Sequence, residues 1–319
     1  MSILTNYNKP TGKLPRVVLC ESFDQRVLRA AHILNQHKLA HVVLLGNYDE
    51  LDRAAVGYRA SLDGIEVLDY ESAILQESIR SGLAAMAPDA NLDPTDPVVA
   101  GAWLARSGMA DAVLAGAAST PSHILRLYIK LLGVAEDCKT VSGMSLVTFE
   151  SCPFVRNQIV CLADVSVVPE PTVEQFADIA IQSAVNYQRI TGVEPRVAFL
   201  SFSTLGSSDH PSALKMREAA ALTVSRKPNL SVDGEMQIDA ALIPAIAGTK
   251  SPSSSVAGNA NVLIFPSLSA GNIAVKIFQK FTDHRILGPM LQGMKHPASY
   301  IPRASSAEDI VDQVRLMTI

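Results

Sequence analysis

The stretch AVLAGAASTPSHILR, residues 112–126, decides the fold class of this chain. It begins with five apolar or glycine residues, AVLAG, as a buried strand does. Four small residues follow, and Pro121 then begins a pattern with helical spacing. Proline is favoured at the first position of a helix, and Thr120 before it can cap the exposed N–H groups. The stretch therefore predicts a strand, a short turn and a helix, the repeating unit of an α/β protein.

The same alternation of short apolar runs and helical patterns recurs along the chain. In the first predicted helix, Val27, Leu28, Ala31 and Leu34 recur on one face. The predicted strands span residues 16–20, 41–46, 65–69, 112–116, 158–168, 196–202, 261–267 and 286–291. The predicted helices span residues 24–38, 97–108, 121–133, 172–191, 211–226 and 271–281, with a last helix near the C terminus. Strands that alternate with helices predict mostly parallel sheets with covered faces.

Length and composition indicate a protein with a large core. The 319 residues suffice for two domains of ordinary size or one large domain. Hydrophobic residues make up 48% and charged residues 18%, which suits a large core and a surface covered by another subunit. The net charge of −4 and the absence of long Lys/Arg runs argue against nucleic acid or an anionic membrane as partner. No apolar stretch approaches membrane-spanning length and residues 1–16 lack a signal-peptide core, so we expect a cytoplasmic protein.

Neither cysteines nor histidines form a metal-binding pattern. Buried free thiols are favoured over a disulfide framework or a zinc site, because no C-x-x-C spacing occurs among Cys20, Cys138, Cys152 and Cys161. The seven histidines are scattered. The acids Asp233, Glu235 and Asp239 lie close together, but no histidine is near them. We therefore expect these acids to cap helices or face solvent, and we expect no metal.

The turn before Pro121 carries groups that can bind an anion. Ser119 and Thr120 lie at a helix N-terminus, where free N–H groups and the helix dipole attract negative charge. Arg126 follows within two helical turns. These residues alone favour a capped helix with a solvated arginine.

Two further turns of small residues follow predicted strands. The turn FSTLGSSDH offers the hydroxyl groups of Ser203, Thr204 and Ser207, which could hold a phosphate although the pattern is not a P-loop. The turn SLSAGN ends at Asn272, just before a helix. One such turn is weak evidence, but three at strand ends suggest a phosphorylated or nucleotide-like ligand.

Asp164 lies within a strongly apolar predicted strand, CLADVSVV. A buried carboxylate needs hydrogen-bond partners or a raised pKa. Two roles for Asp164 are about equally favoured. It could pair with an arginine across a cleft, or it could be a structural acid with hydrogen bonds to the backbone.

The run of motifs resembles the phosphate acetyltransferase (phosphotransacetylase) family, which includes the phosphate butyryltransferases. The matching stretches occur in the family's order: DQRVLRAA, LADVSVVPEPTVEQFADIAIQSA, EPRVAFLSFSTLGS, VDGEMQIDAALIP, SPSSSVAGNANVLIFPSLSAGNIAVK, GPMLQG and SAEDIV. They cover nearly the whole chain and are most specific between residues 162 and 293. The likeness is to the short, single-unit form, including relatives from ethanolamine utilisation.

The resemblance implies a fold and an assembly. The expected fold is α/β, with two α/β domains, a cleft between them, and a likeness to isocitrate and isopropylmalate dehydrogenases. The first domain would comprise residues 1–140 and 288–319, and the second residues 141–287. A homodimer is also implied.

The resemblance further implies a reaction, the reversible transfer of an acetyl or other short acyl group between coenzyme A and inorganic phosphate. The partners would be small molecules: acyl-CoA, phosphate and acyl phosphate, with coenzyme A as substrate and no bound cofactor or metal. A free thiol has a pKa of about 8.5, so its attack needs a nearby base. Arginines would neutralise the phosphate and hold it through two hydrogen bonds.

Three residues match functional positions of the family. Arg126, after the Ser/Thr-rich turn, matches a phosphate-binding arginine. Arg303 matches the arginine of the motif D-L-S-R-G-C-S, and Asp309 matches the acid that follows this motif. The resemblance therefore implies that Arg126 and Arg303 bind phosphate and that Asp309 accepts the thiol proton.

The surroundings of Arg303 depart from the family pattern. Pro302 replaces the motif serine thought to help stabilise the transition state, and proline can donate neither a hydroxyl nor an N–H. Ser299 and Tyr300 replace an asparagine-aspartate pair, and Ala304 replaces a glycine. These changes indicate slow turnover or a different substrate.

A helix start explains the same stretch without catalysis. Ser305 and Glu308 have the spacing of a capping box, and Asp309 in the first turn favours the helix dipole. The sequence leaves both explanations open.

Two functions from different classes therefore remain. The first is a phosphate acyltransferase. The second is a non-catalytic acyl-CoA or acyl phosphate binder with a regulatory role. It is favoured by Pro302, by Ala304 and by Val275, which replaces the tyrosine of the family's G-N-I-G-Y-K, and it is opposed by the three retained residues. An NAD-dependent dehydrogenase is a distant third, because no G-x-G-x-x-G follows the early strands.

Overall fold

The computed structural model describes residues 12–86, 92–149, 152, 159–282 and 285–319. Most of the segment tested for a signal peptide, residues 1–11, lies outside these ranges. The chain divides into two compact units. Unit 1 comprises Met1–Ala135 and Met294–Ile319, and unit 2 comprises Glu136–Gly293.

Unit 1 is built on a parallel sheet with strand order β3-β2-β1-β4-β11. Its strands are β1 (Arg16–Leu19), β2 (His41–Leu45), β3 (Glu66–Leu68), β4 (Ala112–Ala115) and β11 (Ala298–Tyr300). Its helices are α1 (Gln25–Gln36), α2 (Tyr48–Gly57), α3 (Ala73–Met86), α4 (Pro97–Arg106), α5 (Pro121–Leu132) and α11 (Ala307–Met317). The expectation of mostly parallel pairing is confirmed here.

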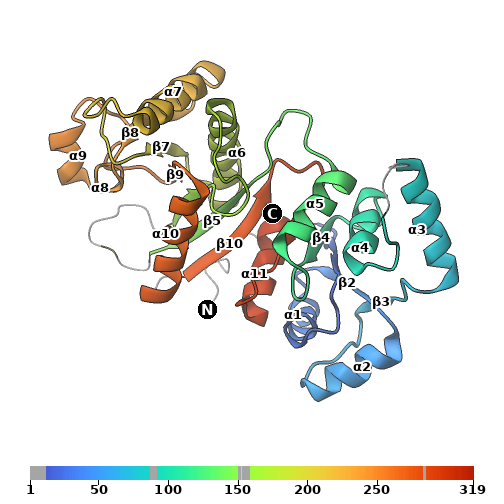
Figure 1. Ribbon diagram of the computed structural model, residues 1–319. Coiled ribbons are helices and arrows are strands. Elements are labelled where there is room, and N and C mark those ends of the chain that lie inside the picture. The colour runs from blue at the N-terminus through green and yellow to red at the C-terminus, as the bar shows by residue number, and fades with distance from the viewer. Residues whose placement is uncertain (1–11, 87–91, 150–151, 153–158, 283–284) are drawn as a thin grey trace. The chain divides into compact units, whose positions relative to one another are not determined.

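Helices cover both faces of this sheet because successive strand residues point to opposite sides. Val17 and Leu19 pack with apolar residues of α1, α2 and α11 in one cluster, and Figure 1 shows α1 and α11 side by side. Val18 and Cys20 lie against α4, where Gly101 leaves no space for a side chain. A Cβ at that position would lie 2.3 Å from the Cys20 sulfur.

Unit 2 contains a mixed sheet with strand order β10-β5-β6-β9-β7-β8. Pairs β10–β5 and β5–β6 are antiparallel, and the other pairs are parallel. Its strands are β5 (Ser142–Thr148), β6 (Ile159–Ala163), β7 (Arg196–Leu200), β8 (Ser231–Met236), β9 (Val262–Ile264) and β10 (Arg285–Gln292). Its helices are α6 (Val173–Thr191), α7 (Pro211–Arg226), α8 (Ile238–Leu242), α9 (Pro244–Lys250) and α10 (Leu268–Phe281).

The elements of unit 2 enclose their own core. Apolar residues of α8 and α10 form a cluster with side chains of β6, β7 and β9. Helices α6 and α7 pack against each other and against the strands.

The thiols behave as expected, since all four cysteines are free and all but the half-buried Cys152 are buried.

The structure corrects several element predictions. The strand predicted over 158–168 ends at Ala163, because the next residue, Asp164, turns the backbone by accepting N–H groups of residues 166–168. Strands β5 and β8 were not predicted, since SGMSLVT and SVDGEM contain glycine and polar residues that disfavour strands in isolation. Tertiary pairing between neighbouring strands overrides that preference.

The sheet of unit 1 reverses its direction of growth between β1 and β4. The chain moves outward from β1 to β2 and β3, and β4 then pairs on the other side of β1. Ligands of open α/β sheets bind beyond the carboxyl ends of the strands at such a point. The segments that follow β1, β4 and β11 are therefore the first place to look for a site.

Candidate active site

Glu21 follows β1 and binds the turn that follows β4. This α5 turn comprises residues 116–120. The Glu21 carboxylate accepts the N–H of Gly116 through Oε2 and the N–H of Ser119 through Oε1, both at 2.5 Å. Oε2 also accepts the N–H of Ala117. The Glu21 carboxylate thus occupies the backbone anion site that the sequence predicted for a phosphate. The only sequence signal for this role of Glu21 was its position directly after a predicted strand.

The α5 turn lies against the start of the segment that follows β11. This β11 loop comprises residues 301–306. Ile301 donates its N–H to the Ala115 carbonyl at 2.7 Å. A Cβ on Gly116 would lie 2.8 Å from the backbone N and O of Ile301, and the φ of Gly116 is +112°. Only glycine permits this close approach, which brings the α5 turn and the β11 loop together.

Helix α5 begins as the sequence predicts. Thr120 is its N-cap, and the Thr120 hydroxyl accepts the N–H of His123 at 3.4 Å. Pro121 occupies the first turn. The backbone N–H of Ser119 is bound to Glu21, so the role of Ser119 and Thr120 in binding phosphate stays a prediction.

Arg126 is exposed on α5 beside a pocket of about 400 Å³. The pocket is lined by Leu92, Asp93, Asp96, Val99, His123, Arg126, Leu127 and Lys130. Arg126 Nη2 lies 3.3 Å from His123 Nδ1, and His123 Nε2 lies 2.7 Å from Asp96 Oδ2. Because arginine can only donate, Nδ1 accepts and Nε2 donates its proton to Asp96. This chain orients Arg126, and sequence reasoning missed both of its supporting residues.

Arg303 lies in the β11 loop with its side chain exposed. Within the described part of the chain, its guanidinium makes no hydrogen bond or ion pair. The loop itself is ordered by a turn in which Ser305 donates its N–H to the Pro302 carbonyl at 3.0 Å. Ser299 and Tyr300, the other altered positions, are buried in β11. Arg303 is therefore a cation available to a ligand in the loop that follows the carboxyl end of β11.

Asp309 lies in the first turn of α11 and takes part in its cap. The Ser306 hydroxyl accepts the N–H of Asp309 at 3.1 Å, and Asp309 Oδ2 accepts the N–H of Ser306 at 2.8 Å. The predicted capping box of Ser305 and Glu308 is therefore wrong by one residue. Ser305 is used by the preceding turn, so the helix begins one position later.

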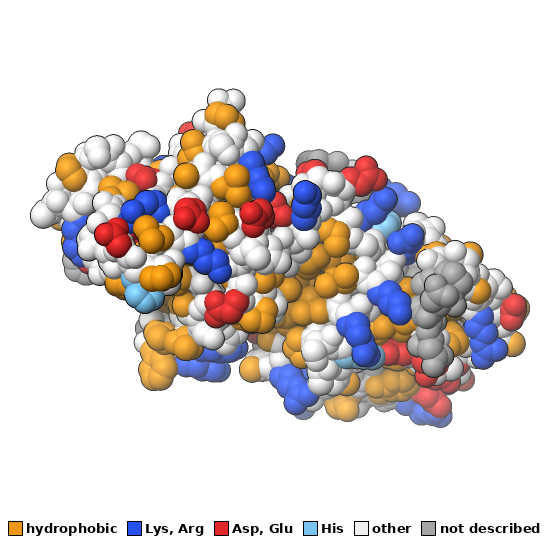
Figure 2. Space-filling view, turned by 45° about the horizontal axis from the view of Figure 1, so that its top comes forward, with side chains coloured by type: hydrophobic (Ala, Val, Ile, Leu, Met, Phe, Trp, Pro, Cys, Tyr) orange, Lys and Arg blue, Asp and Glu red, His pale blue; other side chains and the backbone are white. Residues whose placement is uncertain are grey.

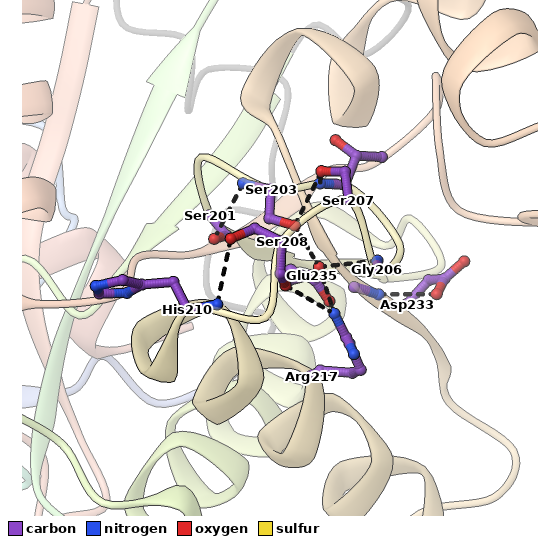
Figure 3. Close-up of polar contacts among 11 residues, drawn as sticks. Ser201, Ser203, Gly206, Ser207, Ser208, His210, Arg217, Asp233 and Glu235 are labelled. Carbon is purple, nitrogen blue, oxygen red and sulfur yellow. Dashed lines mark hydrogen bonds and ion pairs between the residues drawn. The ribbon is translucent and has the colours of Figure 1, made fainter.

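The predicted phosphate-binding turn after β7 is folded around Glu235. This β7 turn comprises residues 201–208. The Ser203 hydroxyl donates to Glu235 Oε1 at 2.7 Å and lies 3.0 Å from the Ser207 hydroxyl (Figure 3). Thr204 Oγ1 accepts the N–H of Gln237 at 3.1 Å. Each predicted hydroxyl already has a protein partner, and the role of Ser203, Thr204 and Ser207 in binding phosphate stays a prediction.

Glu235 corrects the expectation that its acid cluster caps helices or faces solvent. Asp239 does bind the N–H of Ala240, and it pairs with Lys250 at 2.9 Å. Glu235, by contrast, is fully buried. Burial alone would raise its pKa, but hydrogen bonds from Arg217, Ser203 and the Gly206 N–H lower the pKa to about 2.

Asp164 is a structural acid, as one of the two explanations proposed. It accepts the N–H groups of Gly143, Ser166 and Val167 through Oδ1 and that of Val168 through Oδ2, at 2.7–3.2 Å. Burial raises its pKa although these bonds oppose the shift. The predicted ligand residue Asn272 lies on α10 and donates its amide to the Val165 carbonyl at 3.2 Å, so it supports the same turn.

On the face shown in Figure 2, basic, acidic and apolar side chains are all exposed. Within the described ranges, no group of three or more His, Cys, Asp or Glu side chains could hold a metal ion. The same ranges contain no helix with the length and apolar character needed to cross a membrane.

One family model matches nearly the whole chain, residues 2–318, and it describes phosphate acetyl/butaryl transferases. The chain is 36% identical over 321 residues to a phosphate acetyltransferase of Thermoanaerobacterium thermosaccharolyticum, with 98% of each protein covered. A solved phosphotransacetylase from Streptococcus pyogenes is 30% identical, with a TM-score of 0.89 over 99% of this chain and 98% of that one. The EutD phosphotransacetylase from Staphylococcus aureus is 28% identical, with a TM-score of 0.83 over 99% and 95%. The mixed α/β fold thus matches solved phosphotransacetylases, and the chain belongs to the phosphate acetyl/butaryl transferase family.

Proposed function

We propose that this protein is a phosphate acyltransferase, which transfers an acetyl or other short acyl group reversibly between coenzyme A and inorganic phosphate. The observation that carries the proposal is the exposed Arg303 guanidinium in the β11 loop, which packs against the α5 turn. Membership of the family supports the same reaction. A cation that pairs with none of the described residues, in a loop packed against the turn that follows β4, fits a substrate that carries phosphate.

Arg303 and Arg126 are the proposed phosphate ligands. Guanidinium groups hold a phosphate through paired hydrogen bonds and neutralise its charge. The three N–H groups bound by Glu21 are occupied in this structure, so the two side chains are the better candidates for the phosphate contact. Lys130, which lines the pocket beside Arg126, adds positive charge there.

Asp309 is the proposed base for the thiol of coenzyme A. Its Oδ2 accepts the Ser306 N–H, while Oδ1 has no hydrogen bond to any residue that the structure describes. The thiol proton would pass to Asp309, and the resulting thiolate would attack the acyl carbonyl. The carbon–sulfur bond forms, the carbon–oxygen bond to phosphate breaks, and phosphate leaves with its charge held by the arginines.

A direct assay tests this function. We expect coenzyme A-dependent release of phosphate from acetyl, propionyl or butyryl phosphate, together with thioester formation at 1:1 stoichiometry. Omission of coenzyme A is the control for spontaneous hydrolysis. A folded protein that turns over none of these compounds but binds coenzyme A would instead support the non-catalytic binder considered above.

We also propose that the protein is a homodimer. The outer face of α10 carries Ile273, Ile277 and Phe281, which are spaced four residues apart and are 50–82% exposed. Such a stripe on a helix is typical of a face covered by a partner. The likeness to isocitrate and isopropylmalate dehydrogenases, and a cleft between two domains, likewise stay proposals that rest on the family resemblance.

A further inference from the structure

Arg26, in the first turn of α1, is held in a fixed orientation by Asp24. Its Nε donates to Asp24 Oδ1 at 2.9 Å, and its Nη2 donates to Asp24 Oδ2 at 2.8 Å. This is the paired geometry that planar guanidinium and carboxylate groups favour. Burial would raise the pKa of Asp24, but the bonds from Arg26 lower it, so the pair stays charged at neutral pH. The side chains of both residues are about three-quarters buried.

The remaining donors of Arg26 bind the two segments at the candidate site. Nη1 donates to the carbonyl of Arg303 at 2.8 Å and is 3.3 Å from the carbonyl of Ser305. Nη2 also donates to the carbonyl of Ala117 in the α5 turn, at 3.1 Å. One guanidinium therefore links the β11 loop to the α5 turn through three backbone oxygens. It touches the backbone of the very residue whose side chain we propose as a phosphate ligand.

We infer that Arg26 is a positioning residue, which fixes Arg303 relative to the α5 turn so that the Arg303 guanidinium meets the phosphate. The inference rests on the proposed function. The β11 loop needs such support because Pro302 has no N–H and the side chain of Ala304 has no polar group. A lysine in place of Arg26 would keep the charge, but a single ammonium group cannot bind Asp24 through a paired contact and reach three carbonyls.

The test is a double-mutant cycle between Arg26→Lys and Arg303→Ala. We expect Arg26→Lys to lower kcat with acetyl phosphate and coenzyme A by about tenfold to a hundredfold, since displacement of a ligand by about 1 Å can cost that much. The KM for coenzyme A should change less than twofold. In the Arg303→Ala background, Arg26→Lys should reduce kcat by less than about twofold further. Arg29→Lys, at an exposed position of the same helix, is the matched control and should behave as wild type.

The same cycle is measured with inorganic phosphate by titration calorimetry, which does not depend on turnover. Arg26→Lys should weaken phosphate binding in the wild-type background and not in the Arg303→Ala background. Equal losses in both backgrounds would show that Arg26 only stabilises the fold and would overturn the inference, as would unchanged kcat and phosphate affinity. A wild type that binds phosphate without turning over acyl phosphates would refute the proposed function alone. If Arg26→Lys does not fold, Arg26→Gln replaces it, with melting temperature as the criterion.

Discussion

The Arg217 guanidinium binds the Glu235 carboxylate through two hydrogen bonds, from Nε to Oε2 at 2.9 Å and from Nη2 to Oε1 at 3.1 Å. Figure 3 shows this pair with the Ser203 hydroxyl and the Gly206 N–H directed at the same carboxylate. The contacts join α7, β8 and the β7 turn within unit 2. Glu235 is thus a buried, charged acid that accepts several hydrogen bonds, and the conformation of the β7 turn depends on it.

The first prediction concerns the pH dependence of stability. The pKa of Glu235 is lowered from 4.5 to about 2 on folding, so the unfolded state binds more protons between these values. The stabilisation from Glu235 is therefore fully present above about pH 4.5 and is lost as the pH falls towards 2. Urea unfolding should show Glu235→Gln less stable than wild type at pH 7, with a difference that shrinks below pH 4.5. Glu218→Gln, at an exposed position of α7, should show no such trend, and a constant difference for Glu235→Gln would contradict the prediction.

The second prediction concerns Asp164. Asp164→Asn replaces one acceptor oxygen with an amide donor that faces N–H groups, so buried donors lose their partner. We expect a loss of about 1–3 kcal/mol in the free energy of unfolding. Denaturant titration measures it, with Asp233→Asn as the control because the Asp233 side chain binds only the N–H of Gly234 among the described residues. Equal stability of the Asp164 variant and wild type would show that this turn does not need a carboxylate.

The third prediction separates two roles of Asp309. Asparagine can still accept the Ser306 N–H and keeps the shape of the cap, but it cannot accept a thiol proton at neutral pH. We expect Asp309→Asn to lower kcat by at least a hundredfold while the melting temperature changes by no more than a few degrees. Glu308→Gln, exposed in the same turn, is the control. Full activity with a lowered melting temperature would assign Asp309 to the helix start alone.

The fourth prediction contrasts Arg303 with its neighbour Pro302. Loss of the guanidinium in Arg303→Ala should lower kcat/KM. The activation free energy that corresponds to kcat/KM should rise by about 2–4 kcal/mol, by analogy with deletion of a transition-state donor. Pro302→Ser should leave kcat/KM equal or raise it, because it restores a hydroxyl beside Arg303. Steady-state kinetics with acetyl phosphate and coenzyme A compare the two variants. If Pro302→Ser is as damaging as Arg303→Ala, the loop shape matters more than the cation.

The fifth prediction concerns assembly. Ile277 is 50% exposed on the apolar stripe of α10, and a buried charge in a dimer interface is costly. Light scattering at micromolar concentration should give a dimer mass for wild type and the monomer mass of 34.1 kDa for Ile277→Asp. Ile74→Asp, at a position 87% exposed on α3, should remain dimeric. A monomeric wild type would rule out the proposed homodimer.

The sequence by itself determined the elements whose signals are local. Pro121 and Thr120 mark the start of α5, and helix α7 has the bounds that its apolar spacing predicted. Periodicity and capping act within a few residues, so they can be read without the fold. The order of family motifs likewise predicted the family and the reaction class, because it depends only on residue types along the chain.

Tertiary structure alone decided which groups meet. Glu21 binds N–H groups 95 and 98 positions away, and Arg26 binds a carbonyl 277 positions away. No local pattern encodes such pairs, because they form where parallel strands bring their carboxyl ends to one edge of a sheet. For the same reason the β7 turn, which resembled a phosphate cradle in sequence, directs the Ser203 hydroxyl and the Gly206 N–H at Glu235 in the fold. A chain segment shows which groups can bind a negative charge, and only the folded path shows whether an internal carboxylate already supplies it.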